Sequence, residues 1–282
     1  MTTHIAVAMS CEARPLLDAF GLRRDPAATA YPVFAGEGIA LVVTGVGTVA
    51  SAGGVGYLAG RTGATRADPW VNVGIAGHAT LPIGTVALGH EVRDAATGRR
   101  RYPPRSLVES MDSTAVISVA DVEREYAEDA AYEMEAAGFV DTARRFGAAE
   151  IVQVLKVASD GPGELWNELD EARIVELMAQ TIEPLRSLVA CLAGAPVGAP
   201  LSGDLLESRL SSWRFSVTQR RQLASLQRRW QALVAEEDFV ASLEDALSTI
   251  AASASRTEIL ARLEAFVSAL PIVLGASTDG PV

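Results

Sequence analysis

The stretch that decides the fold runs from Ile151 to Asp160 and reads IVQVLKVASD. Its first eight residues are apolar except for Gln153 and Lys156, a pattern typical of a central strand in a parallel sheet. The residues from Ser159 to Gly163 favour a turn that cannot continue as helix. Ligands of open α/β sheets bind at the carboxyl ends of strands, so Asp160 is a candidate catalytic acid, although it could equally be a turn-forming residue.

Upstream of this stretch, strands and helices alternate, which predicts α/β architecture. Short apolar runs predict strands at residues 4–9, 31–34, 39–44, 70–78, 83–92 and 114–119. Glu12 lies where the first strand meets the first helix, at the sheet edge expected to bind ligands, although a helix N-terminus also favours an acid there. Glycine-rich turns follow two of the strands, at residues 44–48 and 74–77, and let the backbone approach a ligand closely.

A second candidate region is the acidic stretch from Tyr132 to Phe139, YEMEAAGF. Read as a helix, it places Glu133 and Glu135 about 200° apart, so that one acid faces inward and the other faces water. A buried carboxylate needs a partner or a ligand with hydroxyl groups. The alternative is a surface helix whose acids interact favourably with its N-terminus.

The pattern of predicted secondary structure changes after Asp170. Residues 172–192 read as helical, 194–200 as a linker rich in glycine and proline, and the remainder as helices only. We therefore expect a catalytic domain at 1–193, a linker at 194–200 and a helical extension at 201–282. The extension has capping-box spacing at Ser216 and Ser255, apolar stripes around Trp230 and Leu263, and an arginine-rich face that is most simply a solvated surface.

Composition narrows the function classes. The 282-residue chain carries a formal net charge of −11, which argues against a general nucleic-acid binder. Two cysteines are too few for a disulfide framework, and neither a signal peptide nor a membrane-length apolar run is evident, so we expect a cytoplasmic protein. The three histidines lack metal-ligand spacing, so no metal site is predicted.

Four segments in order carry a resemblance to a known family. They are Met9-Ser10-Cys11-Glu12, Gly74-Ile75-Ala76-Gly77, Glu133-Met134-Glu135-Ala136 and Ser159-Asp160. Together they resemble the nucleoside phosphorylase/nucleosidase superfamily, most of all its methylthioadenosine/S-adenosylhomocysteine nucleosidases, over roughly residues 4–193. This resemblance implies a three-layer α/β/α fold around a twisted central mixed sheet, with the C-terminal helical extension outside it.

The resemblance also implies roles and a reaction, cleavage of the N-glycosidic bond of a purine nucleoside through an oxocarbenium-like transition state. Glu12 matches the base that activates water, and Asp160 matches the acid that protonates the purine, with Ser159 orienting it. Glu135 matches the acid that holds the ribose hydroxyls, and Met134 the residue packed under the sugar. The reaction needs no metal or redox cofactor, and the family is usually oligomeric, often a homodimer.

The chain departs from the family pattern at three places. Ile75 replaces the usual Ser of its turn, and Lys156 replaces the Arg near the attacking water, although lysine cannot form a bidentate fork. The segment between Val119 and Glu133, which helps to build the base pocket, is also short. Phosphorolysis, with inorganic phosphate as co-substrate, therefore stays an alternative that Arg14 and Lys156 could serve. A non-catalytic nucleotide sensor is a third possibility.

Overall fold

The computed structural model describes residues 1–104, 111–162, 169–195, 206, 209–210, 212–231, 236–251 and 253–270. By its internal contacts the chain divides into two compact units, Met1–Val197 and Gly198–Val282. None of the described helices combines the length and apolar composition of a membrane-spanning segment. The predicted linker lies largely outside the described residues, since 196–200 are not among them.

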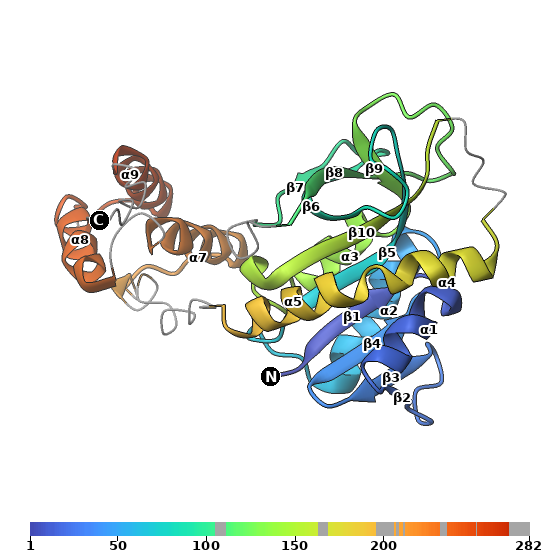
Figure 1. Ribbon diagram of the computed structural model, residues 1–282. Coiled ribbons are helices and arrows are strands. Elements are labelled where there is room, and N and C mark those ends of the chain that lie inside the picture. The colour runs from blue at the N-terminus through green and yellow to red at the C-terminus, as the bar shows by residue number, and fades with distance from the viewer. Residues whose placement is uncertain are drawn as a thin grey trace, which may run out of the picture. The chain divides into compact units, whose positions relative to one another are not determined.

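The first unit is built on one mixed sheet, as predicted (Figure 1). Five helices accompany the sheet in the described part of this unit. The strands are β1 (Thr3–Val7), β2 (Arg23–Arg24), β3 (Val33–Gly36), β4 (Ile39–Val43), β5 (Trp70–His78), β6 (Val86–Asp94), β7 (Arg100–Arg101), β8 (Ser113–Ser118), β9 (Ala130–Glu133) and β10 (Val152–Asp160). The helices are α1 (Ser10–Ala19), α2 (Thr48–Thr62), α3 (Ala136–Ala143), α4 (Glu171–Ala179) and α5 (Ile182–Ala193), with a 3-10 turn at Ala149–Ile151.

The strand β10 lies beside β5 in parallel register and beside β6 in antiparallel register. Both of its edges are therefore paired, which explains its nearly unbroken apolar sequence. From β6 the pairing continues through β8 to β9, and β9 returns to β5. This half of the sheet thus closes on itself, a feature that the sequence patterns did not indicate. The other half is open and runs from β5 through β1 and β4 to the short strands β3 and β2.

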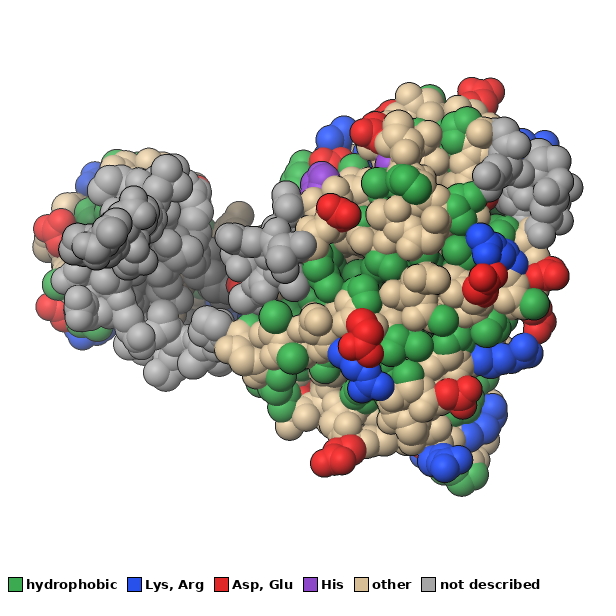
Figure 2. Space-filling model, in the orientation of Figure 1, with side chains coloured by type: hydrophobic (Ala, Val, Ile, Leu, Met, Phe, Trp, Pro, Cys, Tyr) green, Lys and Arg blue, Asp and Glu red, His purple; other side chains and the backbone are tan. Residues whose placement is uncertain are grey.

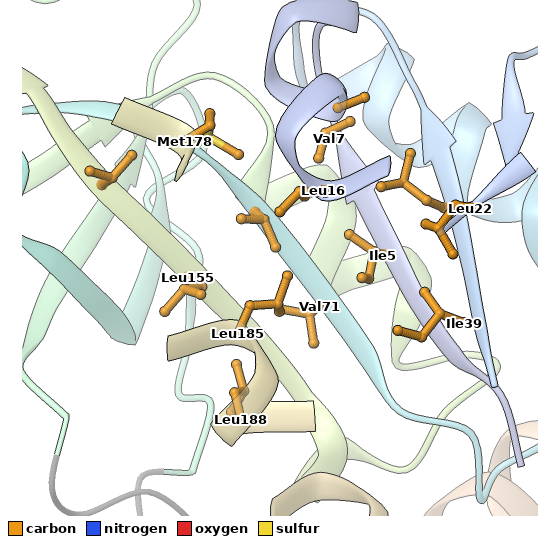
Figure 3. Close-up of a cluster of buried hydrophobic side chains, with 14 of the residues drawn as sticks. Ile5, Val7, Leu16, Leu22, Ile39, Val71, Leu155, Met178, Leu185 and Leu188 are labelled. Atoms are coloured by element: carbon orange, nitrogen blue, oxygen red, sulfur yellow. The ribbon is translucent and has the colours of Figure 1, made fainter. Parts of the chain in front are cut away.

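Helices cover both faces of the sheet, as the expected three-layer fold requires (Figure 1). On one face α1, α4 and α5 pack over a core of aliphatic side chains, several of which point toward one another in Figure 3. Ile5, Val71 and Leu155 come from the strands, and Leu16 and Leu185 come from the helices. On the other face α2 and α3 cover a second core. Burying each such aliphatic side chain stabilises the fold by roughly 1.5–3 kcal/mol.

The segment 172–192 is helical, as predicted, and Gln180 and Thr181 divide it into the helices α4 and α5. Thr181 donates its hydroxyl to the carbonyl of Met178 at this break. The segment 97–104 contains the two-residue strand β7, which pairs with the end of β6.

The second unit has a core of its own. Its described helices α7 (Val217–Gln231), α8 (Glu236–Ser248) and α9 (Arg256–Ala269) pack around the fully buried Trp230. Both predicted capping boxes form, at Ser216 with Gln219 and at Ser255 with Glu258. Of the predicted stripe residues, Leu233 and Val234 lie outside the described residues.

Charge on the first unit is mixed. Figure 2 shows one face of this unit, on which acidic and basic side chains are interspersed without forming a single basic patch. That face therefore lacks the concentrated positive charge with which general nucleic-acid binders neutralise phosphates.

Candidate active site

A cavity of about 480 Å³ opens at the carboxyl ends of the parallel strands β1, β5 and β10. Its volume lies within the range of small-molecule sites. Acidic side chains supply most of its polar lining, and valine, methionine and tyrosine supply much of the apolar lining. The residues around it are Ala8, Met9, Glu12, Val46, Ile75, Ala76, Gly77, Val119, Val122, Glu123, Tyr126, Tyr132, Glu133, Met134, Glu135, Ser159, Asp160, Leu169 and Ile174.

Glu12 lies in the first turn of α1, directly behind β1, as the sequence predicted. Its carboxylate is 2% exposed and accepts three backbone N–H groups, from Ala8 and Met9 at 2.9 Å and from Ile75 at 3.0 Å. Burial raises the pKa of Glu12, while Lys156 and the three N–H donors act in the opposite direction. The side chain is thereby held rigidly at the wall of the cavity.

Lys156 lies behind the cavity wall instead of lining it. Its Nζ is 2.9 Å from Oε2 of Glu133, and both side chains are almost fully buried. Burial alone would lower the pKa of Lys156, but the nearby Glu133, Glu135 and Glu12 more than offset this and raise it. A single buried ammonium group therefore balances three carboxylates.

The prediction that Glu133 and Glu135 face opposite ways was wrong. Both side chains are buried and both line the cavity. The reason is that the stretch changes from strand to helix between them: Glu133 ends β9 and Glu135 directly precedes α3. The 100° helical step therefore does not apply across this pair.

The side chains of Glu133 and Ser118 cap the start of α3, where the strand changes to helix. Glu133 Oε2 accepts the backbone N–H groups of Glu135 at 3.0 Å and Ala136 at 2.8 Å, and Oε1 accepts the hydroxyl of Ser118 at 2.5 Å. Ser118 Oγ in turn accepts the N–H of Ala137 at 2.9 Å. The carboxylate therefore satisfies the first N–H groups of α3, which would otherwise lack partners at a buried helix start.

Glu135 contacts the glycine-rich turn that precedes α2. Its Oε1 accepts the N–H of Gly47 at 2.7 Å, so the turn at 44–48 and the acidic stretch meet in one site. Burial, followed by the charge of Glu133, raises the pKa of Glu135 to about 7. This carboxyl can therefore exchange hydrogen bonds with ligand hydroxyl groups in either protonation state near neutral pH.

Asp160 is the last residue of β10. We predicted it in the turn that follows the strand, so its predicted position was one element too late. Its Oδ1 accepts the hydroxyl of Ser159 at 2.5 Å, and its Oδ2 accepts the hydroxyl of Tyr126. Gly77 of β5 lies against it: a Cβ there would be 2.9 Å from Asp160 Oδ2 and 2.6 Å from Tyr126 Oη. Only glycine allows the acid and the phenol to sit this close to β5.

Tyr126 is the site residue that sequence reasoning missed. It comes from the polar segment between β8 and β9, where it is buried and packs edge-on against Tyr132 at a centroid distance of 5.6 Å. Its φ of 46° lies in the left-handed region, and no other non-glycine among the described residues has a positive φ. The sequence feature that could have identified Tyr126 as a site residue is that it is a single aromatic residue within a run of charged ones.

Most of the sequence-predicted site residues meet in this cavity. Gly74 and Lys156 are the exceptions, but both lie directly behind it: a Cβ on Gly74 would be 2.8 Å from Glu12 Oε1 and 3.3 Å from Lys156 Nζ. Among the described residues, no three histidine, cysteine or acidic side chains are grouped so as to hold a metal ion. The predicted residues that line the cavity are Glu12, Ile75, Ala76, Gly77, Glu133, Met134, Glu135, Ser159 and Asp160.

Two groups of polar side chains lie at different positions along β5. Glu12 and Lys156 lie against Gly74, whereas Asp160 and Tyr126 lie against Gly77. Three residues of strand span about 10 Å, which is comparable to the length of a nucleoside. The cavity therefore presents carboxylates to both ends of a ligand of that size.

No protein-family model matches this chain, and no curated protein does either. Solved structures do match its N-terminal two-thirds. The 5′-methylthioadenosine nucleosidase of Arabidopsis thaliana aligns with a TM-score of 0.60 at 16% identity, over 69% of this chain and 96% of the plant protein. Futalosine hydrolase of Helicobacter pylori aligns with a TM-score of 0.58 at 17% identity, over 67% and 97%.

A third match is the 5′-methylthioadenosine/S-adenosylhomocysteine nucleosidase of S. pneumoniae, solved with a transition-state inhibitor. Its TM-score is 0.55 at 18% identity, over 68% of this chain and 99% of the bacterial enzyme. In all three cases the match spans nearly the whole of the known protein. The N-terminal unit of this chain therefore has the nucleoside phosphorylase/nucleosidase fold, as the sequence resemblance implied.

Proposed function

We propose that the N-terminal unit is an N-glycosidase that hydrolyses the bond between the sugar and the base of a purine nucleoside. One observation carries this proposal. Buried Glu12 and Asp160 line the same cavity, and each lies against a different glycine of β5, about 10 Å apart along the strand. The fold shared with nucleosidases gives the proposal its reaction class.

At the base end, Asp160 is the proposed general acid. As the C1′–N bond breaks, its electron pair stays on the base, and a proton from Asp160 to a ring nitrogen neutralises the developing negative charge. Ser159 holds the other carboxyl oxygen and so fixes the orientation of the acid. A positioned general acid of this kind contributes on the order of 10²–10⁴ in rate.

At the sugar end, Glu12 is the proposed base. Water bonds to C1′ through its oxygen, and Glu12 takes up the proton that the water loses. Burial raises the pKa of Glu12, which brings a carboxylate closer to the range in which a general base works efficiently near neutral pH. Its three backbone donors keep it in place between turnovers.

The transition state also develops positive charge on the sugar, which the site must stabilise. Glu133 and Glu135 lie beside the cavity, where their carboxylates stabilise an oxocarbenium-like sugar electrostatically. Glu135 accepts hydrogen bonds from the ribose hydroxyls, and Met134 between the two acids packs under the sugar ring. The proposed chemistry uses side chains and water only.

Water is favoured over phosphate as the nucleophile. Three buried carboxylates surround the sugar end, and their charge repels a phosphate dianion. Neither of the two cations considered as phosphate ligands lines the cavity. Lys156 is paired with Glu133, and Arg14 forms an exposed ion pair with Glu171 at 2.9 Å, outside the cavity lining.

The test is a nucleoside panel with and without inorganic phosphate, read by chromatography for the free base. It contains adenosine, inosine, 5′-methylthioadenosine, S-adenosylhomocysteine and futalosine, since structural neighbours carry the last three in their names. We expect base release from at least one nucleoside at a rate independent of phosphate. Release that requires phosphate would identify a phosphorylase, and no release from any nucleoside would contradict the proposal.

A further inference from the structure

The phenol of Tyr126 contacts the carboxyl group of Asp160, the proposed general acid. The phenol hydroxyl donates to Oδ2 of Asp160, while Ser159 already donates to Oδ1. Each carboxyl oxygen of the proposed acid thus has a hydroxyl donor from the protein itself. A base that is to receive a proton from Asp160 must reach one of these same oxygens.

Tyr126 occupies this position at a conformational cost. Its φ of 46° belongs to the left-handed region, which residues with large side chains adopt only when the surroundings enforce it. It belongs to the segment between Ser118 and Ala130, which contains neither helix nor strand. Its side chain is held by the Asp160 contact and by packing on Tyr132.

The phenol acts as a hydrogen-bond donor and not as an acid. Burial, followed by the contact with Asp160, raises the pKa of Tyr126 well above its usual range. The hydroxyl thus keeps its proton at neutral pH. A proton relay through Tyr126 would require the opposite shift.

We infer that Tyr126 is a positioning residue that occupies the base-binding edge of Asp160, and that a purine base displaces its hydroxyl on binding. The inference rests on the proposed function, because it takes Asp160 as the group that meets the base. Displacement releases the left-handed backbone at residue 126. The bond to Asp160 therefore competes with the ligand and sets the selectivity of the site for bases that can replace it.

The first experiment compares binding of free adenine and free hypoxanthine to the wild-type chain, Tyr126→Phe and Tyr57→Phe by calorimetry. Phenylalanine keeps the ring and removes the competing hydroxyl, so at least one base should bind about tenfold more tightly to Tyr126→Phe. Tyr57→Phe is the matched control, since its hydroxyl contacts Thr29 N–H at 3.2 Å and lies outside the cavity lining. Unchanged or weaker binding to Tyr126→Phe, or no binding of either base to it, would overturn the inference.

A second measurement follows the Tyr126 hydroxyl directly in the wild-type chain. The chain contains five tyrosines, and ring-carbon labelling at the hydroxyl-bearing position gives one signal for each, with Tyr126→Phe identifying its own. Saturating base should shift the Tyr126 signal as its bond to Asp160 breaks. A Tyr126 signal that stays in place under saturating base would contradict displacement.

These outcomes are separate from those of the proposed function. A chain that cleaves no nucleoside but shows tighter base binding in Tyr126→Phe contradicts the proposed reaction and keeps the inference. A chain that cleaves nucleosides while Tyr126→Phe leaves base affinity and KM unchanged keeps the reaction and contradicts the inference. For an active enzyme, the expected effect of Tyr126→Phe is a lower KM with little loss of kcat.

Discussion

Lys156 Nζ lies 2.9 Å from Glu133 Oε2, and both side chains are at most 3% exposed. This ion pair ties the middle of β10 to the end of β9, two strands that lie on opposite sides of β5 in the pairing order. Glu133 also caps α3, so the same carboxylate joins two strands and a helix. The pair is thus a structural centre of the site as well as part of its electrostatics.

Replacing Lys156 by methionine should destabilise the protein strongly. The change leaves Glu133 buried without its cation, and breaking one partner of a buried pair costs about 3–5 kcal/mol. The measurement is the free energy of unfolding from urea titration. The double variant Lys156→Met with Glu133→Gln should recover part of the loss, because it removes the unpaired charge.

Arg14→Gln is the control for that experiment. It breaks an ion pair whose side chains are 58% and 70% exposed, and such pairs contribute about 0–1 kcal/mol. Equal losses for Arg14→Gln and Lys156→Met would contradict the importance assigned to burial of the Lys156 pair.

Glu135→Gln should make the protein more stable at alkaline pH. The pKa of Glu135 rises from its ordinary value of 4.5 in the unfolded chain to about 7 in the native one. Between these values the native state binds the extra proton, so stability falls as pH rises through that window and stays reduced above it. The variant escapes this loss, which amounts to at most about 3 kcal/mol.

The measurement is Tm from pH 5 to pH 8 for wild type and Glu135→Gln. The difference between the two should be small at pH 5 and grow to its full size at pH 8. Glu37→Gln, at an exposed turn, is the control for the loss of one carboxylate charge. A difference that shrinks toward pH 8 would have the wrong sign for a carboxyl with a raised pKa.

Glu135→Gln should also discriminate between sugars. A carboxylate that accepts from a ribose hydroxyl forms a charge-assisted hydrogen bond, about twice as strong as a neutral one. The variant should therefore lose far more kcat/KM on a riboside than on the matching 2′-deoxyriboside. Equal losses on both sugars would show that Glu135 does not contact the ribose hydroxyls.

A chain that ends at Val197 should keep the chemistry. All the proposed catalytic residues lie at or before Asp160, and the second unit has its own core around Trp230. The cut belongs after Val197 because Leu192 is buried in the first core and Ala195 packs against it. The measurement is kcat of the shortened and full chains on one nucleoside. A shortened chain that is folded by circular dichroism yet inactive would show that the second unit completes the site.

Patterns that depend on neighbouring residues could be predicted from the sequence. The apolar runs predicted β5 and β10, and the placement of Glu12 and Asp160 near the carboxyl ends of strands followed from such runs. The prediction of helix or strand was wrong where the chain changes conformation within three residues. Between Glu133 and Glu135 a strand becomes a helix, and no periodicity extends across so short a switch.

Contacts between distant segments could not be predicted. The hydroxyl of Tyr126 meets an acid 34 residues later, and this depends on a left-handed backbone that tyrosine does not favour locally. The N–H of Gly47 meets Glu135 across 88 residues. The closure of β9 onto β5 is likewise a tertiary pairing, and it brings Tyr132 beside Gly77.

The central claim is that Asp160 protonates the leaving base, and Asp160→Asn tests it most directly. Asparagine keeps the size of the side chain, and its one amide oxygen can still accept from either Ser159 or Tyr126, so the fold should persist by circular dichroism. The measurement is the rate of free-base release, by chromatography, from the nucleoside that the wild-type chain cleaves fastest. We predict a fall on the order of 10²–10⁴. A rate within a few-fold of wild type would contradict the assignment of Asp160 as the general acid.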